Sequence, residues 1–222
     1  MKKLVIFDLD GTLLNTISDI TKSINLALTD LGLKNIDISD SKYVVGSGVD
    51  ILAQRTIKLI FKEKYEENKE YVDMLKEKYQ YYYTIHQKDE TAPYPNIIKM
   101  LEKLQENNIK IAVLSNKPHI DTVNVMNNYF NNVKFDCILG KIPENDIKPS
   151  PDGVFMIERK LNITKESDIL YVGDTDVDIK TAKNANLKVL ACTWGFRKKE
   201  ELEKADKIID DPFDIVKEAI NG

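Results

Sequence analysis

The chain has 222 residues, of which 42% are hydrophobic and 31% charged, a composition typical of a soluble globular protein. The formal net charge of -4 argues against a nucleic-acid or anionic-membrane surface, because such partners require a basic face. Cys137 and Cys192 form no CxxC pair, which disfavours a zinc site or a redox dithiol. No segment approaches the roughly 20 apolar residues that span a bilayer, and we expect a cytoplasmic protein.

The first predicted element is an apolar strand within VIFDLDGTLLNT (5–16) that stops at two aspartates. Alternate residues of an extended segment point the same way, so Asp8 and Asp10 can face one site while the residue between them points into the core. Gly11 permits a turn or a close approach of the backbone to a ligand, and Thr12 adds a hydroxyl and an amide. Aspartates are poor strand formers and are rarely buried unpaired, so this pair indicates a site at the strand end.

Residues 16–90 show helical periodicity and no strand pattern, which predicts a helical insert directly after the first strand. Apolar residues recur at helical spacing over 17–31, and Gly32 is placed to end that helix. A second helix is expected over 49–61 and a third over about 66–86.

The glycine-flanked turn VVGSGVD (44–50) lies between two of these helices. It is either a plain connector or a loop that reaches the substrate, where the exposed amides of Gly46, Ser47 and Gly48 can bind an anion. Arg55 follows within the next two turns. The ordinary interpretation of Arg55 is a solvated side chain, and the alternative is a partner for a substrate charge.

From residue 91 onward, predicted strands alternate with predicted helices. We expect strands at 109–116, 135–140, 168–176, 188–195 and 207–210, and helices at 96–107, 118–130, 151–161, 176–186 and 212–220. This alternation implies right-handed crossover units and a parallel sheet covered on both faces. The expected fold class is therefore α/β, with a Rossmann-like parallel sheet core and a small all-helical cap inserted after strand 1. The expected domains are a core of residues 1–15 and 91–222 and a cap of residues 16–90.

Polar side chains follow three of these strands, and open α/β sheets bind ligands beyond the carboxyl ends of their strands. These side chains are Asp8 and Asp10, Ser115 and Asn116, and Asp174, Asp176 and Asp178, with Lys148 in the nearby loop KIPENDIKPSP. Clustered carboxylates repel one another, and oxygen ligands without a nearby histidine favour Mg²⁺. A metal, a lysine, a hydroxyl and backbone amides together predict a phosphate site. We interpret Asp176 as the cap of the helix that it opens rather than as a metal ligand.

The segments DLDGTL, LSNKP, IKPSP and VGDTDVDI resemble, in chain order, the four motifs of the haloacid dehalogenase-like hydrolases. SNKPH and TWGFRKKEEL further resemble the phosphoglycolate phosphatase branch of that superfamily. The resemblance spans the whole sheet domain, and the helical insert resembles the superfamily's cap. One departure is Asn15, where many relatives carry an acid; it lies outside the four catalytic groups.

The resemblance implies roles for five of the matched charged residues. Asp8 would be the nucleophile that takes the phosphoryl group, and Asp10 would protonate the leaving alcohol and then deprotonate water. Lys148 would offset negative charge on Asp8 and the phosphoryl group. Asp174 would bind Mg²⁺ together with Asp8 and the carbonyl of Asp10. Asp178 would orient Lys148 or a water on the metal.

The resemblance also implies contacts to the substrate. Ser115 and the amide of Asn116 would hold phosphate oxygens, and Thr12 would add its own polar groups to the phosphate site. For the turn in the insert, the resemblance favours the substrate-reaching interpretation. The expected contacts there are Gly46, Ser47, Gly48 and Arg55.

The function expected from the resemblance is a Mg²⁺-dependent phosphomonoester hydrolase that acts through an aspartyl phosphate, with 2-phosphoglycolate as the preferred substrate. We expect a small phosphorylated metabolite as partner, no nucleic acid or membrane, and a monomer or homodimer. One alternative is another small-molecule phosphatase, a pyrophosphatase or a phosphosugar mutase on the same site. The second alternative is a non-catalytic phosphate-binding module, which the loss of a catalytic aspartate would indicate; both aspartates are present.

Overall fold

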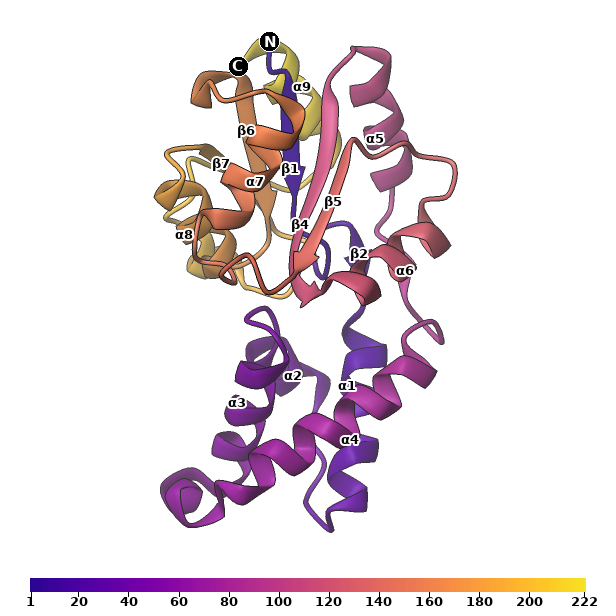
Figure 1. Ribbon diagram of the computed structural model, residues 1–222, viewed down its shortest axis with the longest axis vertical. Helices are drawn as coiled ribbons and strands as arrows, with labels where there is room; N and C mark the ends of the chain where they lie inside the picture. The colour runs from indigo at the N-terminus through magenta and orange to yellow at the C-terminus, as the bar shows by residue number, and fades with distance from the viewer. The chain divides into compact units, whose positions relative to one another are not determined.

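The structure is a computed structural model that describes residues 1–222, and it divides into two compact units (Figure 1). The core unit comprises Met1–Leu14 and Pro93–Gly222, and the helical unit comprises Asn15–Ala92. The chain passes between them through β2 (Leu14–Asn15) and β3 (Ala92–Pro93), two short strands that pair in their own sheet. The boundaries expected from the sequence differ from this division by one or two residues.

Six strands form the sheet of the core unit, in the order β5-β4-β1-β6-β7-β8 and all parallel (Figure 1). They are β1 (Leu4–Phe7), β4 (Lys110–Pro118), β5 (Cys137–Lys141), β6 (Ile169–Gly173), β7 (Lys188–Cys192) and β8 (Lys207–Ile209). The chain builds outward from β1 to β4 and β5, then returns to β6 on the other side of β1. Strand order therefore reverses at β1 and β6, which is where open α/β sheets bind ligands.

Residues of β1 alternate between two apolar cores, because successive strand residues point to opposite faces of a sheet. Val5 and Phe7 join one core, and Leu4 and Ile6 join the other. The first core is closed by α5 (Ile97–Glu106), α6 (His119–Tyr129) and α9 (Phe213–Asn221), and the second by α7 (Asp152–Leu161) and α8 (Asp176–Asn184). The parallel sheet covered on both faces is confirmed, and each strand and helix expected after residue 91 is present within three residues of its predicted ends.

The helical unit contains four α-helices and a 3₁₀ segment. They are α1 (Ile17–Asp30), α2 (Ile38–Val44), α3 (Val49–Phe61), η1 (Lys62–Asn68) and α4 (Glu70–His86). The sequence did not predict α2, because its seven residues bury only Ser41 and Val44 and show no apolar period.

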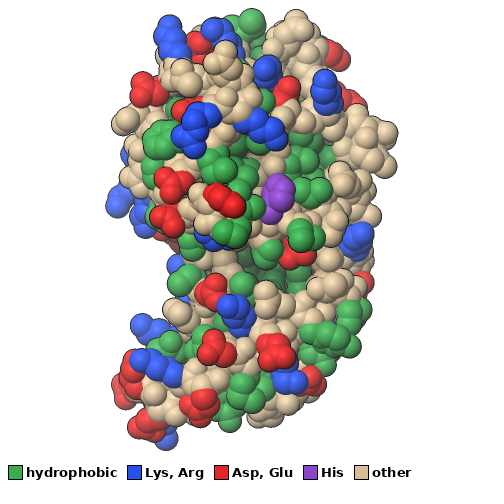
Figure 2. Space-filling view, viewed as in Figure 1, with side chains coloured by type: hydrophobic (Ala, Val, Ile, Leu, Met, Phe, Trp, Pro, Cys, Tyr) green, Lys and Arg blue, Asp and Glu red, His purple; other side chains and the backbone are tan.

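The surface carries both signs of charge. On the face drawn in Figure 2, Lys and Arg side chains are interspersed with Asp and Glu, as the small net charge leads one to expect. None of the helices combines the length and the apolar character that crossing a bilayer requires.

Candidate active site

Asp8 directly follows β1 at the reversal of strand order. Its backbone N–H donates to the Val172 carbonyl at 2.9 Å, which continues the pairing of β1 with β6 by one residue. The side chain is buried, and its Oδ1 accepts a hydrogen bond from Lys148 Nζ at 2.7 Å. Burial raises the pKa of the Asp8 carboxyl well above its ordinary value; the charge of Asp178 adds to this rise and the Lys148 ammonium opposes it. Further positive charge would therefore be needed to keep Asp8 fully ionised.

Lys148 reaches the same point from the loop between β5 and α7. Its buried ammonium contacts Oδ1 of Asp8 and Oδ1 of Asp178, each at 2.7 Å. Burial alone would discharge the lysine, but the carboxylates of Asp178 and Asp8 outweigh burial and raise the pKa of Lys148 well above its ordinary value. Lys148 is therefore held as a cation between two carboxylates.

Asp178 is fully buried and surrounded by donors. Besides Lys148, its Oδ1 lies 3.4 Å from the Tyr171 hydroxyl, and its Oδ2 accepts from the backbone N–H of Thr175 at 3.1 Å and from the Thr175 hydroxyl at 2.7 Å. Thr175 is the N-cap of α8 and Asp178 its third residue, so these bonds belong to a capping box. The helix start thus fixes the carboxylate that holds Lys148.

Asp174 follows β6 and is fully buried. Its Oδ1 accepts from the Thr12 hydroxyl at 3.0 Å, and its Oδ2 accepts from the backbone N–H of Phe196 at 2.7 Å. Burial, and then the charge of Asp178, raises the pKa of Asp174 to about 7. The two hydrogen bonds and the charge of Arg197 lower the pKa of Asp174 but offset the rise only in part.

Two glycines close around Asp174. A Cβ atom on Gly11 would lie 2.4 Å from Oδ2 of Asp174, and a Cβ on Gly195 would lie 2.3 Å from its Cβ. Gly11 also has a φ of +94°, which L side chains rarely adopt. The carboxylate is thus confined to one position by backbone on two sides.

One carboxylate oxygen from each of Asp8, Asp174 and Asp178 lies within 4.8 Å of the others, and we call these three residues the carboxylate cluster. Its donors are all oxygen, and Lys148 is the one ammonium that contacts it directly among the ion pairs of the chain. A single ammonium leaves the cluster with excess negative charge. Buried oxygen donors with excess negative charge fit a hard divalent cation such as Mg²⁺.

Asp10 contacts a partner that the sequence did not predict. Its Oδ1 accepts from Lys117 Nζ at 3.0 Å, and both side chains are largely buried. The signal was available: Lys117 follows Ser115 at the end of the strand next to β1, so it had to lie at the same edge of the sheet as Asp10. Asp10 is not a member of the carboxylate cluster.

Ser115 and Asn116 lie near the end of β4, where the register with β5 shifts between Leu114 and Pro118. Both are buried. The Ser115 hydroxyl accepts from the Lys117 backbone N–H at 3.2 Å. The structure thus brings both residues to the carboxyl edge of the sheet that also carries Asp8.

Thr12 makes protein contacts through each of its polar groups. Its hydroxyl donates to Asp174, its amide donates to the Leu9 carbonyl at 3.3 Å, and its carbonyl accepts from the Trp194 indole at 3.0 Å. These bonds make Thr12 a support for Asp174, a role that the sequence did not suggest.

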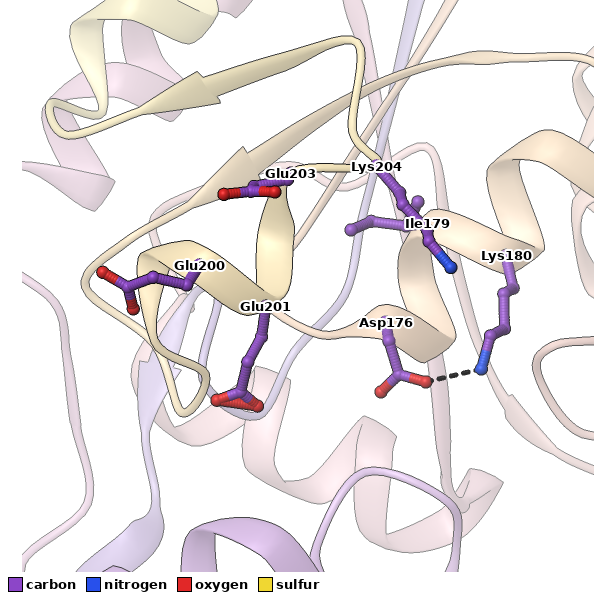
Figure 3. A pocket seen from close by; sticks show the side chains of 7 residues that line it. All are labelled: Asp176, Ile179, Lys180, Glu200, Glu201, Glu203 and Lys204. Atoms are coloured by element: carbon purple, nitrogen blue, oxygen red, sulfur yellow. Dashed lines mark hydrogen bonds and ion pairs between the residues drawn. The ribbon is translucent and has the colours of Figure 1, made fainter.

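The interpretation of Asp176 as a helix cap is wrong, because Thr175 is the N-cap and Asp176 is the first residue of α8. Asp176 instead pairs with Lys180 at 2.6 Å, with both side chains about half exposed (Figure 3). Asp176 also borders a charged pocket of ≈ 260 Å³ beside the 3₁₀ segment Lys199–Leu202. The pocket is lined by Asp176, Ile179, Lys180, Glu200, Glu201, Glu203 and Lys204 (Figure 3). It shares no residue with the carboxylate cluster.

The remaining predicted contacts lie in the helical unit. Gly46, Ser47 and Gly48 join α2 to α3, and Arg55 lies on α3. The Arg55 guanidinium donates to the Tyr43 carbonyl at 3.3 Å. Contact of these four residues with a substrate stays a prediction.

Comparison with known proteins points to one family. A model of the haloacid dehalogenase-like hydrolases matches residues 5–192. A phosphoglycolate phosphatase from Aquifex aeolicus is 32% identical over 215 residues, which are 97% of this chain and 95% of that protein. The crystal structure of a predicted phosphoglycolate phosphatase from Haemophilus somnus superposes with a TM-score of 0.88 at 30% identity over 97% of both chains. The structure of a candidate phosphoglycolate phosphatase from Lactobacillus delbrueckii gives 0.94 at 29% identity over 100% of both.

Proposed function

The chain belongs to the haloacid dehalogenase-like hydrolase family as a phosphatase, and from this premise we propose that it hydrolyses 2-phosphoglycolate to glycolate and phosphate with Mg²⁺ as its cofactor. One observation carries the mechanism: the buried Asp8 carboxylate lies 2.7 Å from the Lys148 ammonium at the edge of the sheet where strand order reverses. The choice of substrate is supported by relatives that match nearly the whole chain and are named phosphoglycolate phosphatases.

In this proposal, a carboxylate oxygen of Asp8 attacks phosphorus, and the bond from phosphorus to the ester oxygen breaks. Asp10 gives its proton to the departing glycolate oxygen. The aspartyl phosphate is then hydrolysed by water, whose proton returns to Asp10, so the enzyme is regenerated. Lys148 offsets the negative charge shared by Asp8 and the phosphoryl oxygens throughout both steps.

The residues proposed to hold Mg²⁺ are Asp8, Asp174 and the backbone carbonyl of Asp10. When bound, the ion would neutralise carboxylate and phosphate oxygens together. Support comes from the raised pKa values of Asp8 and Asp174, since both describe carboxylates that lack sufficient positive charge around them. Asp178 serves Lys148, and Ser115 with the backbone amide of Asn116 binds phosphate oxygens.

We assign substrate selection to the helical unit, acting as a cap. The groups above serve the phosphoryl end, and phosphoglycolate carries a second anion, its carboxylate. The amides of Gly46, Ser47 and Gly48, with the charge of Arg55, are the proposed partners of that carboxylate. The protein would act in the cytoplasm on a small metabolite, as a monomer or homodimer, without nucleic acid or membrane.

The test is phosphate release from a panel of phosphomonoesters, with Mg²⁺ and with excess chelator. We expect the highest kcat/KM on 2-phosphoglycolate, a lower value on hexose phosphates, and no turnover in chelator. Equal rates across the panel would leave a general phosphatase. Phosphate exchange with a sugar bisphosphate, without net release, would indicate a mutase, and phosphate binding without turnover of any substrate would indicate a binding module.

A further inference from the structure

We propose that the Asn116 side chain is a positioning group that clamps the backbone of Lys148 and thereby holds the lysine ammonium against Asp8. This inference rests on the proposed function only in that Lys148 acts there. The sequence suggested a role for the backbone amide of Asn116 and none for its side chain.

The clamp has two bonds to one residue. Oδ1 of Asn116 accepts from the backbone N–H of Lys148 at 2.7 Å, and Nδ2 of Asn116 donates to the Lys148 carbonyl at 3.1 Å. Both residues are buried. The partners are one obligate donor and one obligate acceptor, so they fix which way the amide of Asn116 points.

The position of Lys148 in the chain explains why a clamp is needed. Lys148 lies in the segment of residues 142–151, between β5 and α7, which contains no helix or strand. Connecting segments are more mobile than the elements they join, and a lysine side chain has several rotatable bonds. Holding its ammonium at 2.7 Å from two carboxylates therefore requires that the backbone beneath it be fixed.

Asn116 fixes the Lys148 backbone to the central sheet. It belongs to β4, which is paired in register with β1, and Asp8 follows β1 directly. The clamp therefore fixes the Lys148 backbone to the same sheet that carries Asp8. The capping box at the start of α8 separately fixes Asp178. The ammonium is thus preorganised from two elements, which is how charge stabilisation avoids reorganisation during a reaction.

The same loop offers a matched control. Asn145 is also buried, and its Oδ1 accepts from the backbone N–H of Ile142 at 2.8 Å. Asn145→Ala loosens the loop at a distance from Lys148, whereas Asn116→Ala removes both bonds to Lys148 itself. Asn116→Ser, which keeps one hydroxyl, is the milder variant should Asn116→Ala fold poorly.

The first measurement needs no substrate: hydrogen exchange of the Lys148 amide in the full-length protein by NMR. We expect exchange to accelerate about tenfold or more in Asn116→Ala, less in Asn116→Ser, and not in Asn145→Ala. Unchanged exchange at Lys148 in both Asn116 variants would overturn the clamp. This result stands even if no phosphomonoester is hydrolysed, an outcome that would defeat only the proposed function.

The second measurement is steady-state kinetics on 2-phosphoglycolate. We expect kcat to fall about 10- to 100-fold in Asn116→Ala with KM within about threefold, and Asn145→Ala to stay within about threefold of wild type. In a Lys148→Met background, Asn116→Ala should cost no more than about threefold, because the group it positions is gone. A full loss in that background, or a loss confined to KM, would show that Asn116 acts on the substrate and not through Lys148.

Discussion

The core unit contains two groups of acidic side chains, the buried carboxylate cluster and the acidic residues that line the charged pocket. The two groups include residues that are close in sequence, but they differ in their exposure to water. Asp174 belongs to the buried carboxylate cluster, whereas Asp176 borders the charged pocket and pairs with Lys180 at the surface. Burial raises the pKa of Asp174 to about 7, while half of the Asp176 side chain stays in contact with water. Burial, rather than the presence of carboxylates, therefore distinguishes the group that is a candidate for catalysis from the one that is not.

Substitution of one aspartate in each group tests this contrast most strongly. Asp8→Asn keeps the shape but removes the attacking charge, so kcat on 2-phosphoglycolate should fall by about 1,000-fold or more. The matched Asp176→Asn should leave kcat within about threefold of wild type, because its carboxylate faces solvent. Rapid-quench experiments with labelled substrate should trap phosphate on Asp8 in wild type. Full activity of Asp8→Asn would remove the covalent mechanism.

Gly195→Ala should damage the carboxylate cluster without touching a charge. The added Cβ would meet Asp174 at 2.3 Å, so the carboxylate must move or the loop must shift. We expect a destabilisation of about 1–3 kcal/mol and a loss of Mg²⁺ affinity of about tenfold or more, measured by calorimetric titration.

Gly32→Ala controls for the general cost of replacing a glycine. Gly32 has a φ of +67°, and a Cβ there would meet nothing within 4 Å. The Gly32→Ala variant should therefore be less stable than wild type but bind Mg²⁺ with the same affinity. Equal Mg²⁺ affinities in the two variants and wild type would contradict a role for Asp174 in metal binding.

The pH dependence of the free energy of unfolding should reflect the titration of the Asp174 carboxyl group. Its folded pKa, about 7, lies above the ordinary value of 3.8, so between these values the folded state holds a proton that the unfolded state releases. This group therefore lowers the free energy of unfolding as pH rises from about 4 to 7 in the absence of metal. Mg²⁺ must displace that proton, so the rise in Tm that Mg²⁺ produces should be larger at pH 8 than at pH 6. An equal rise at both pH values would contradict this assignment.

The smallest effect is expected at the exposed pair. Lys180→Met removes the ion pair with Asp176, whose side chains are 59% and 49% exposed. Such helical i,i+4 pairs contribute at most about 0.5 kcal/mol, so denaturant unfolding should show a change no larger than that. A loss above about 2 kcal/mol would mean that this region is more tightly packed than its exposure indicates.

Periodicity and strand ends were sufficient to predict the sheet and the meeting of distant residues. Asp8 and Lys148 are 140 residues apart, yet both had to reach the carboxyl edge of one parallel sheet. In the helical unit, 49–61 was predicted with the observed bounds of α3 because its apolar residues recur at helical spacing. The short helix α2 lacks such a pattern.

Individual side-chain partners were less accessible to prediction. The Asn116 clamp depends on the path of the loop that carries Lys148, and the Lys117–Asp10 pair depends on a choice of rotamer. Neither follows from hydrophobic pattern. Assigning the cap of α8 to Asp176 instead of Thr175 was an error of one position, which is the usual scale of uncertainty at helix ends.

The central place of β1 has a consequence for biosynthesis. β1 ends at Phe7 and leaves the ribosome before its two neighbours, β4 and β6, which begin only at Lys110 and Ile169. The helical unit, by contrast, is one continuous stretch whose internal contacts are available once Ala92 has emerged. Because domains generally fold as they are synthesised, we expect the nascent chain to carry a folded helical segment while β1 waits unpaired. A fully buried strand of the enzyme, β1, is thus synthesised before both of its partners and completed late.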